Sequence, residues 1–211
     1  MLNQFLTVDL SAFYADVSKD RLYTFAAGSP DRRSAQTAMF IMADGLSRLL
    51  APILPVTADE LWRYLPAPRE ESVHLSEFPR DVERLADRAM DEGWDQLRAI
   101  RDEVNKALEE ARQSKTIGTS LAAHVRLTAG GNAAALLKAH VADLPMLFIA
   151  SQVSLDTSTT EGVTVEILRA DGEKCDRCWR IVPERSNDPR FAGVCLRCVD
   201  ALETGDGREV A

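Results

Sequence analysis

All four cysteines of the chain lie in two Cys-X-X-Cys pairs, and they are the residues whose types and spacing most clearly indicate a chemical role. The pairs are Cys175 with Cys178 and Cys195 with Cys198, separated by sixteen residues. Four thiolates on two tight turns can surround one Zn²⁺ ion tetrahedrally, and two such pairs at about this separation are typical of zinc sites. Two disulfides, or a redox-active pair, are the alternatives. We expect one structural zinc ion, because four cysteine ligands leave no position for water or substrate.

Cationic and aromatic side chains surround these cysteines. Arg177 and Arg197 lie inside the two pairs, and Trp179 and Arg180 follow the first pair. An aromatic face can stack on an unpaired base while guanidiniums hold phosphates, so this group predicts binding to single-stranded RNA. The alternative is that Trp179 covers a finger too small to have its own core, and one side chain could do both.

A second basic group, Arg112 and Lys115, lies where the longest predicted helix ends. A solvated helix end is the simpler interpretation of this pair. The chain has a net charge of −8, so any contact with nucleic acid must depend on a local basic surface. Residues 169–198 carry 7 basic and 5 acidic side chains, and a zinc ion with four thiolates adds two negative charges, which leaves this segment near neutral.

No motif of an active site accompanies the cysteines. The three histidines, His74, His124 and His140, are not spaced to bind a metal with one another or with a carboxylate. The sequence contains no Gly-X-Ser-X-Gly turn, P-loop or Gly-X-Gly-X-X-Gly fingerprint. We therefore expect a binding module that is catalytically inactive by itself.

Helical periodicity dominates the first half of the chain. Apolar residues recur every three or four positions from residue 2 to residue 17 without a preceding N-cap, which suggests a piece of a longer chain, and Ser18-Lys19-Asp20 ends this pattern. Further helices are predicted from about Asp31 to Leu50, from an N-cap at Thr57 with Glu60 as its capping-box partner through Leu65, and from Asp81 to about Ser114. Short connections between these segments predict an antiparallel α-helical bundle.

The pattern after Gly118 is that of a small α+β unit. Strands are predicted at 121–128, 146–153 and 163–168, with a turn at Gly130-Gly131 and a helix at 133–142. The predicted fold is therefore mainly α: a helical bundle, a small α+β junction and a four-cysteine zinc finger. The predicted domains are a helical domain at 1–115, truncated at its N-terminus, the junction at 116–170, the zinc finger at 171–202 and a disordered tail at 203–211.

Four stretches of the sequence resemble isoleucyl-tRNA synthetases. Residues 11–23, SAFYADVSKDRLY, and 50–62, LAPILPVTADELW, are similar to the anticodon-binding helical domain, and the second is shared more loosely with the valyl and leucyl enzymes. Residues 112–121, RQSKTIGTSL, are similar to the junction after that bundle. Residues 174–198, with both cysteine pairs, resemble the C-terminal zinc finger, which is related to that of formamidopyrimidine DNA glycosylases. The resemblance covers nearly the whole chain in the family's order.

This resemblance implies the C-terminal part of a bacterial-type isoleucyl enzyme. The family's His-Ile-Gly-His-like and Lys-Met-Ser-Lys-Ser-like ATP motifs are missing from this sequence, so ATP would be used only in an absent catalytic domain. The implied partners are the anticodon stem-loop of tRNA(Ile) and the missing catalytic and editing part of the same enzyme. The expected RNA-binding residues are those flanking the cysteines and at the helix end: Arg177, Trp179, Arg180, Arg197, Arg112 and Lys115.

Three other functions are compatible with parts of the pattern. The first is a free-standing zinc protein that binds tRNA or a synthetase in trans. The second is a piece of a DNA glycosylase, suggested by the finger alone and opposed by the helical segments. The third is a structural zinc module without RNA contacts. The first twenty residues do not resemble a signal peptide, and no apolar run reaches the ~18 residues that span a bilayer, so we expect a cytoplasmic protein with no membrane contact. We also expect a monomer.

Overall fold

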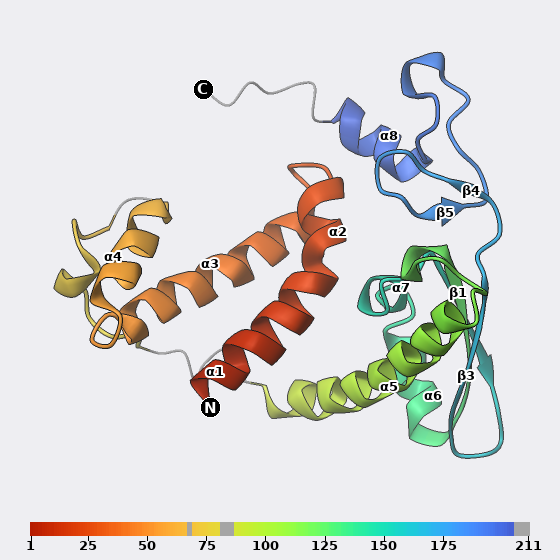
Figure 1. Ribbon diagram of the computed structural model, residues 1–211, viewed down its shortest axis with the longest axis horizontal. Coiled ribbons are helices and arrows are strands. Elements are labelled where there is room, and N and C mark those ends of the chain that lie inside the picture. Colours follow the sequence, from red (N-terminus) through yellow and green to blue (C-terminus); the bar gives the residue numbers. More distant parts are fainter. Residues whose placement is uncertain (67–68, 81–86, 205–211) are drawn as a thin grey trace. The chain divides into compact units, whose positions relative to one another are not determined.

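The computed structural model describes residues 1–66, 69–80 and 87–204. Helices dominate the first half of the chain, and a small sheet and a four-cysteine finger follow (Figure 1). This order confirms the predicted fold class. Contacts divide the chain into two units: residues 1–27 together with the chain from residue 89 onward, and residues 28–88. The domain boundaries predicted from the sequence stay a prediction.

The N-terminal helical segment runs without interruption from residue 2 to residue 24. It consists of α1 (Leu2–Gln4), the π-helical η1 (Phe5–Ala15) and α2 (Asp16–Thr24). The expectation that Ser18-Lys19-Asp20 ends this helix is wrong. Ser18 is buried, and Thr24 Oγ1 donates to the backbone oxygen of Asp20 across one further helical turn, at 2.8 Å. The helix ends where Phe25 becomes extended, with φ −77° and ψ 154°.

The second unit contains α3 (Pro30–Leu50), α4 (Pro55–Tyr64) and the 3₁₀ turn η2 (Val73–Leu75). Its small core consists of Ala51, Ala58, Trp62 and Val73. The predicted capping box at Thr57 and Glu60 is wrong, because α4 begins two residues earlier, at Pro55, whose fixed φ suits the first turn of a helix.

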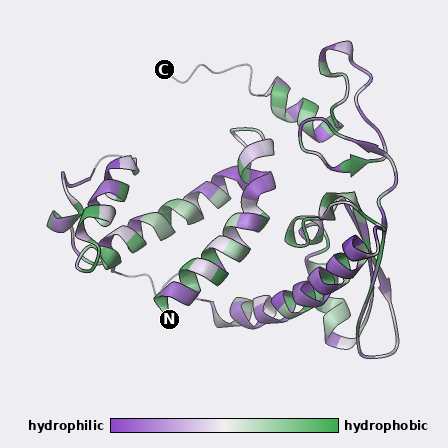
Figure 2. Ribbon diagram, in the orientation of Figure 1, coloured by the Kyte–Doolittle hydropathy of each residue, from purple (hydrophilic) through white to green (hydrophobic). Residues whose placement is uncertain are grey.

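Helix α5 (Arg88–Gln113) covers the sheet of the first unit. Its predicted start at Asp81 lies outside the described residues. Leu97, Val104 and Leu108 are buried against the sheet, whereas the opposite side of α5 is hydrophilic (Figure 2). The helix ends in a Schellman arrangement, in which Thr116 N donates to Ala111 O and Lys115 adopts a φ of 60°.

The sheet has the order β2-β1-β3. Strand β1 (Ala123–Gly130) pairs in parallel with β2 (Gln152–Thr157) and antiparallel with β3 (Gly162–Arg169), and η4 (Ser120–Ala122) precedes it. Between β1 and β2 lie helices α6 (Gly131–Ala139) and α7 (Leu144–Leu147), which complete the crossover that a parallel pair requires.

Two sequence predictions for this region are wrong. The predicted strand at 146–153 is helical at its start, because α7, with Pro145 in its first turn, extends to Leu147 and β2 begins only at Gln152. A short apolar run does not distinguish a buried strand from a buried helical turn. The predicted Gly130-Gly131 turn is instead a direct passage from β1 into α6, made possible by a φ of 58° at Gly131.

The finger follows β3. It contains β4 (Glu173–Lys174), β5 (Ile181–Val182), the 3₁₀ turn η5 (Pro189–Phe191) and α8 (Leu196–Glu203). Helix α8 includes Glu203 and has Thr204 as its C-cap, whereas the rest of the predicted tail, from residue 205, lies outside the described residues. None of the described helices is long and apolar enough to cross a membrane.

Candidate metal centre and its surroundings

The four cysteine side chains converge on one point of the finger, and all four are buried. Their Sγ atoms lie within 4.8 Å of one another, and the Cys175–Cys198 and Cys178–Cys195 distances are both 3.8 Å. A tetrahedron of sulfurs bonded to zinc at about 2.3 Å has edges of about 3.8 Å, whereas a disulfide requires about 2.05 Å. The cysteines therefore fit a zinc ion and form no disulfide, so they provide one structural zinc site.

Hydrogen bonds that involve no metal ion shape the two cysteine turns. Cys175 N donates to Arg180 O at 2.8 Å, and Trp179 N donates to Cys175 O at 2.9 Å. Trp179 adopts a φ of 63° to close this first turn. Cys195 N donates to the sulfur of Cys175 at 3.3 Å, which joins the second turn to the first and helps to stabilise the thiolate.

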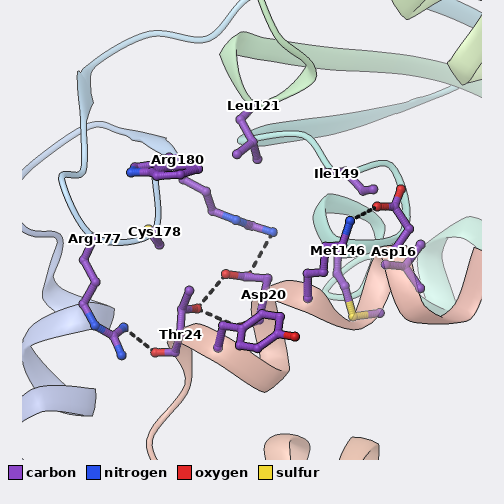
Figure 3. A pocket seen from close by; sticks show the side chains of 13 residues that line it. Asp16, Asp20, Thr24, Leu121, Met146, Ile149, Arg177, Cys178 and Arg180 are labelled. Atoms are coloured by element: carbon purple, nitrogen blue, oxygen red, sulfur yellow. Dashed lines mark hydrogen bonds and ion pairs between the residues drawn. The ribbon is translucent and has the colours of Figure 1, made fainter. Parts of the chain in front are cut away.

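Three arginines of the finger contact the end of α2 rather than pointing into solvent. Arg197 donates twice to Asp20, at 2.6 and 2.9 Å, and Arg180 Nη2 lies 3.4 Å from the same carboxylate. Arg177 Nη1 donates to the backbone oxygen of Thr24 at 2.5 Å (Figure 3). The same nitrogen lies 3.5 Å from Cys198 Sγ. We call these five residues, Asp20, Thr24, Arg177, Arg180 and Arg197, the Asp20 clasp.

Burial and ion pairing oppose each other in the clasp. Burial alone would raise the pKa of Asp20, but hydrogen bonds from Arg197 and Thr24 and the charges of Arg180 and Arg197 bring that pKa below its ordinary value. Burial would lower the pKa of Arg197, yet hydrogen bonding to Asp20 and its charge raise it instead. Asp20 and Arg197 are therefore both charged at neutral pH.

Trp179 differs from these arginines because its side chain remains accessible. It is 61% exposed, and the amine of Lys174 lies 5.6 Å from the centre of its ring. Trp179 is one of the residues that line a cavity of about 420 Å³. The walls come from α2, from the finger turn at 177–180 and from three apolar side chains of the sheet unit, Leu121, Met146 and Ile149.

Arg112 and Lys115 lie at the end of α5 and are exposed, outside the Asp20 clasp. Arg112 pairs with Glu109 of the same helix at 2.6 Å. The next residue after Lys115, Thr116, accepts a hydrogen bond from Arg169 Nε of β3 at 2.6 Å, which fixes the helix end against the strand that leads into the finger. The predicted RNA-binding residues thus form two separate groups, and their role in RNA binding stays a prediction.

Sequence reasoning missed Asp20 and Thr24. Asp20 is 177 positions from Arg197, and it lies in an exposed-looking Lys-Asp-Arg triplet that gives no local sign of a distant partner. The one available signal was the four-residue spacing of Asp20 and Thr24, which places both on one face of a helix if that helix continues past Asp20.

Comparisons with known proteins match both the helical part of the chain and its finger. Residues 1–127 match the family described as the anticodon-binding domain of tRNA ligase, and residues 172–201 match the zinc finger found in FPG and IleRS. An isoleucine–tRNA ligase of Syntrophotalea carbinolica is 43% identical over 210 residues, or 95% of this chain and 23% of that protein. Those of Geobacter sulfurreducens (40% identical, covering 96% of this chain and 23% of that protein) and Carboxydothermus hydrogenoformans (43%, covering 95% and 22%) are also similar.

The chain spans less than a quarter of the length of these curated relatives and matches their C-terminal part. The two family matches follow each other in the same order as the helical part and the finger of the structure. The chain therefore belongs to the anticodon-binding domain family of tRNA ligases, with a zinc finger of the isoleucyl-enzyme type after that domain.

Proposed function

We propose that this chain is the tRNA-recognition region of an isoleucine–tRNA ligase, the enzyme that attaches isoleucine to tRNA(Ile) with ATP. In this proposal it binds the anticodon stem-loop as a cytoplasmic monomer, while catalysis and editing belong to the remainder of the enzyme. The match of residues 1–127 to an anticodon-binding domain carries the proposal. The names of the similar proteins support the choice of isoleucine.

Trp179 is the finger residue best suited to meet RNA directly. Its indole is largely exposed beside Lys174, so one face can stack on an unpaired base while a cation lies close by. Arg112 and Lys115 are exposed cations that can hold phosphates.

Zinc would act indirectly, since four thiolates saturate it and it supplies no reactive position. The residues that would hold it are Cys175, Cys178, Cys195 and Cys198. By fixing both turns, they fix the backbone that presents Trp179. The finger would otherwise depend on a core of a few side chains, with Val182 and Val194 packed against the cysteines.

Titration of the zinc-loaded chain with RNA hairpins tests the proposal. One hairpin carries the anticodon stem-loop of tRNA(Ile), a second carries a changed anticodon, and a third has a fully paired loop. We expect the first to bind most tightly and the third most weakly, measured by fluorescence anisotropy at fixed salt. Equal affinity for the first two hairpins would contradict anticodon recognition, and equal affinity for all three would leave only backbone binding.

A further inference from the structure

The Asp20 clasp joins parts of the chain that are far apart in sequence, and it does so with charged groups that are removed from solvent. The side chains of Arg180 and Asp20 are only 16% and 20% exposed, and that of Arg197 is 34% exposed. The guanidinium carbon of Arg197 also lies 4.9 Å from the centre of the ring of Phe25, the residue that follows α2. A bidentate, partly buried arginine–carboxylate pair has a defined geometry, unlike a pair on an open surface.

The charges of this region balance one another. Three guanidiniums face one carboxylate and a zinc centre whose four thiolates leave it with two negative charges, so the cluster as a whole is neutral. Arg180 and Arg197 feel the charge of Cys178, and Arg177 reaches the sulfur of Cys198. These cations are thus needed inside the protein, because a buried centre with net charge −2 is costly without compensation.

From this arrangement we propose that Asp20 is a positioning residue for RNA recognition: it fixes the finger on α2 and thereby determines the position of the Trp179 side chain. Asp20 itself touches no RNA. The inference rests on the proposed function, since it assigns the clasp a role in presenting the finger to the same RNA. Arg177 adds a direct link between metal and helix, because one nitrogen contacts both a zinc ligand and the Thr24 carbonyl.

We call the finger seated when the Asp20 clasp holds it against α2. The affinity for RNA then depends on the fraction of molecules in which the finger is seated. If RNA binds only the seated form, the apparent dissociation constant rises as that fraction falls. Without the Asp20 charge, Arg180 and Arg197 remain partly buried beside each other with no carboxylate between them. Their mutual repulsion then favours the unseated finger.

The test compares wild type with Asp20→Asn, which has nearly the same shape, in the zinc-loaded chain of 211 residues. Glu166→Gln is the matched control, because it removes one carboxylate that pairs with an exposed arginine, Arg126, across β1 and β3. Zinc content is measured for each variant. Amide hydrogen exchange is followed in peptides that cover 17–25, 175–182 and, as an internal reference, 123–130.

We expect Asp20→Asn to retain one zinc, to exchange at least about tenfold faster at 17–25 and 175–182, and to leave 123–130 unchanged, as loss of a charge-assisted hydrogen-bond pair predicts. Affinity for the anticodon hairpin should fall about tenfold, whereas Glu166→Gln should match wild type.

Arg197→Gln should weaken RNA binding similarly. The double variant Asp20→Asn with Arg197→Gln should lose less binding free energy than the sum of the two single losses, because both substitutions break the same interaction. Asp20→Glu should restore part of the affinity by keeping the charge.

Two outcomes would overturn the proposal. Unchanged exchange at 17–25 and 175–182 in Asp20→Asn would show that the clasp does not seat the finger. Faster exchange with unchanged RNA affinity would show that seating does not matter for recognition. If wild type itself fails to bind the hairpin, the proposed function fails, while the exchange measurement still decides whether Asp20 seats the finger. If Asp20→Asn does not fold, Arg197→Gln supplies the same comparison from the other side of the pair.

Discussion

Replacement of Trp179 by glycine separates its role in RNA stacking from a role in covering the finger. The side chain is 61% exposed, so folding covers about 100 Å² of it, which is worth at most about 2.5 kcal/mol of hydrophobic stabilisation. Its φ of 63° costs a side chain about 1 kcal/mol or more, and glycine relieves that strain. The net loss of stability should therefore be at most about 1.5 kcal/mol.

That loss is small beside the binding energy of zinc, which is about 10–16 kcal/mol in isolated zinc fingers. Trp179→Gly should therefore keep one zinc and a folded finger. Its affinity for the anticodon hairpin should nevertheless fall between about fivefold and about 150-fold, since stacking contributes about 1–3 kcal/mol per base. Trp179→Phe, which keeps a ring and the backbone strain, should retain most of the affinity.

The assay combines zinc quantification, thermal unfolding and hairpin titration on the same three proteins. A Trp179→Gly chain that loses zinc would mean that the indole mainly covers the finger. A chain that keeps zinc and binds the hairpin as tightly as wild type would refute stacking at this residue. Only retained zinc with reduced affinity agrees with the structural argument.

Three further predictions concern the rest of the site. Lys115→Gly should raise the melting temperature, because φ 60° favours glycine, while it lowers RNA affinity and reduces the salt slope of binding by about 0.7 to 0.9 for one lost phosphate contact; an unchanged slope would remove Lys115 from the interface. Cys195→Ser should abolish stoichiometric zinc binding, and a chain that retains one zinc would contradict the four-thiolate site. The pKa of Asp20 lies below its ordinary 3.8, so the stabilising effect of the Asp20 carboxylate should be complete above pH 3.8 and lost only below it. The difference in unfolding free energy between wild type and Asp20→Asn should therefore stay constant from pH 6 to pH 8. A difference that shrinks within this window would implicate another group.

Periodic segments and the metal site could be predicted from the sequence because their signals are local. The stripe of α3 and the alternation of β3 each depend on neighbouring residues, and the structure has these elements at nearly the predicted positions. The four cysteines were equally readable, since two turns of fixed length place their own ligands. By contrast, the run at 146–153 combined a helical turn and a strand start, and nothing within it marks where one becomes the other.

The arginines of the finger show why spacing alone could not predict the surroundings of the metal. Arg177, Arg180 and Arg197 look like a basic surface when they are counted along the chain, because the negative charges that balance them are not adjacent in sequence. One of those charges comes from Asp20 at the far end of the chain, and the others come from the zinc–thiolate centre itself. Arginines beside a four-cysteine site therefore compensate negative charges within the protein before they are available to bind phosphates. Trp179, which has no such internal partner charge and stays exposed, becomes the more direct indicator of an RNA surface.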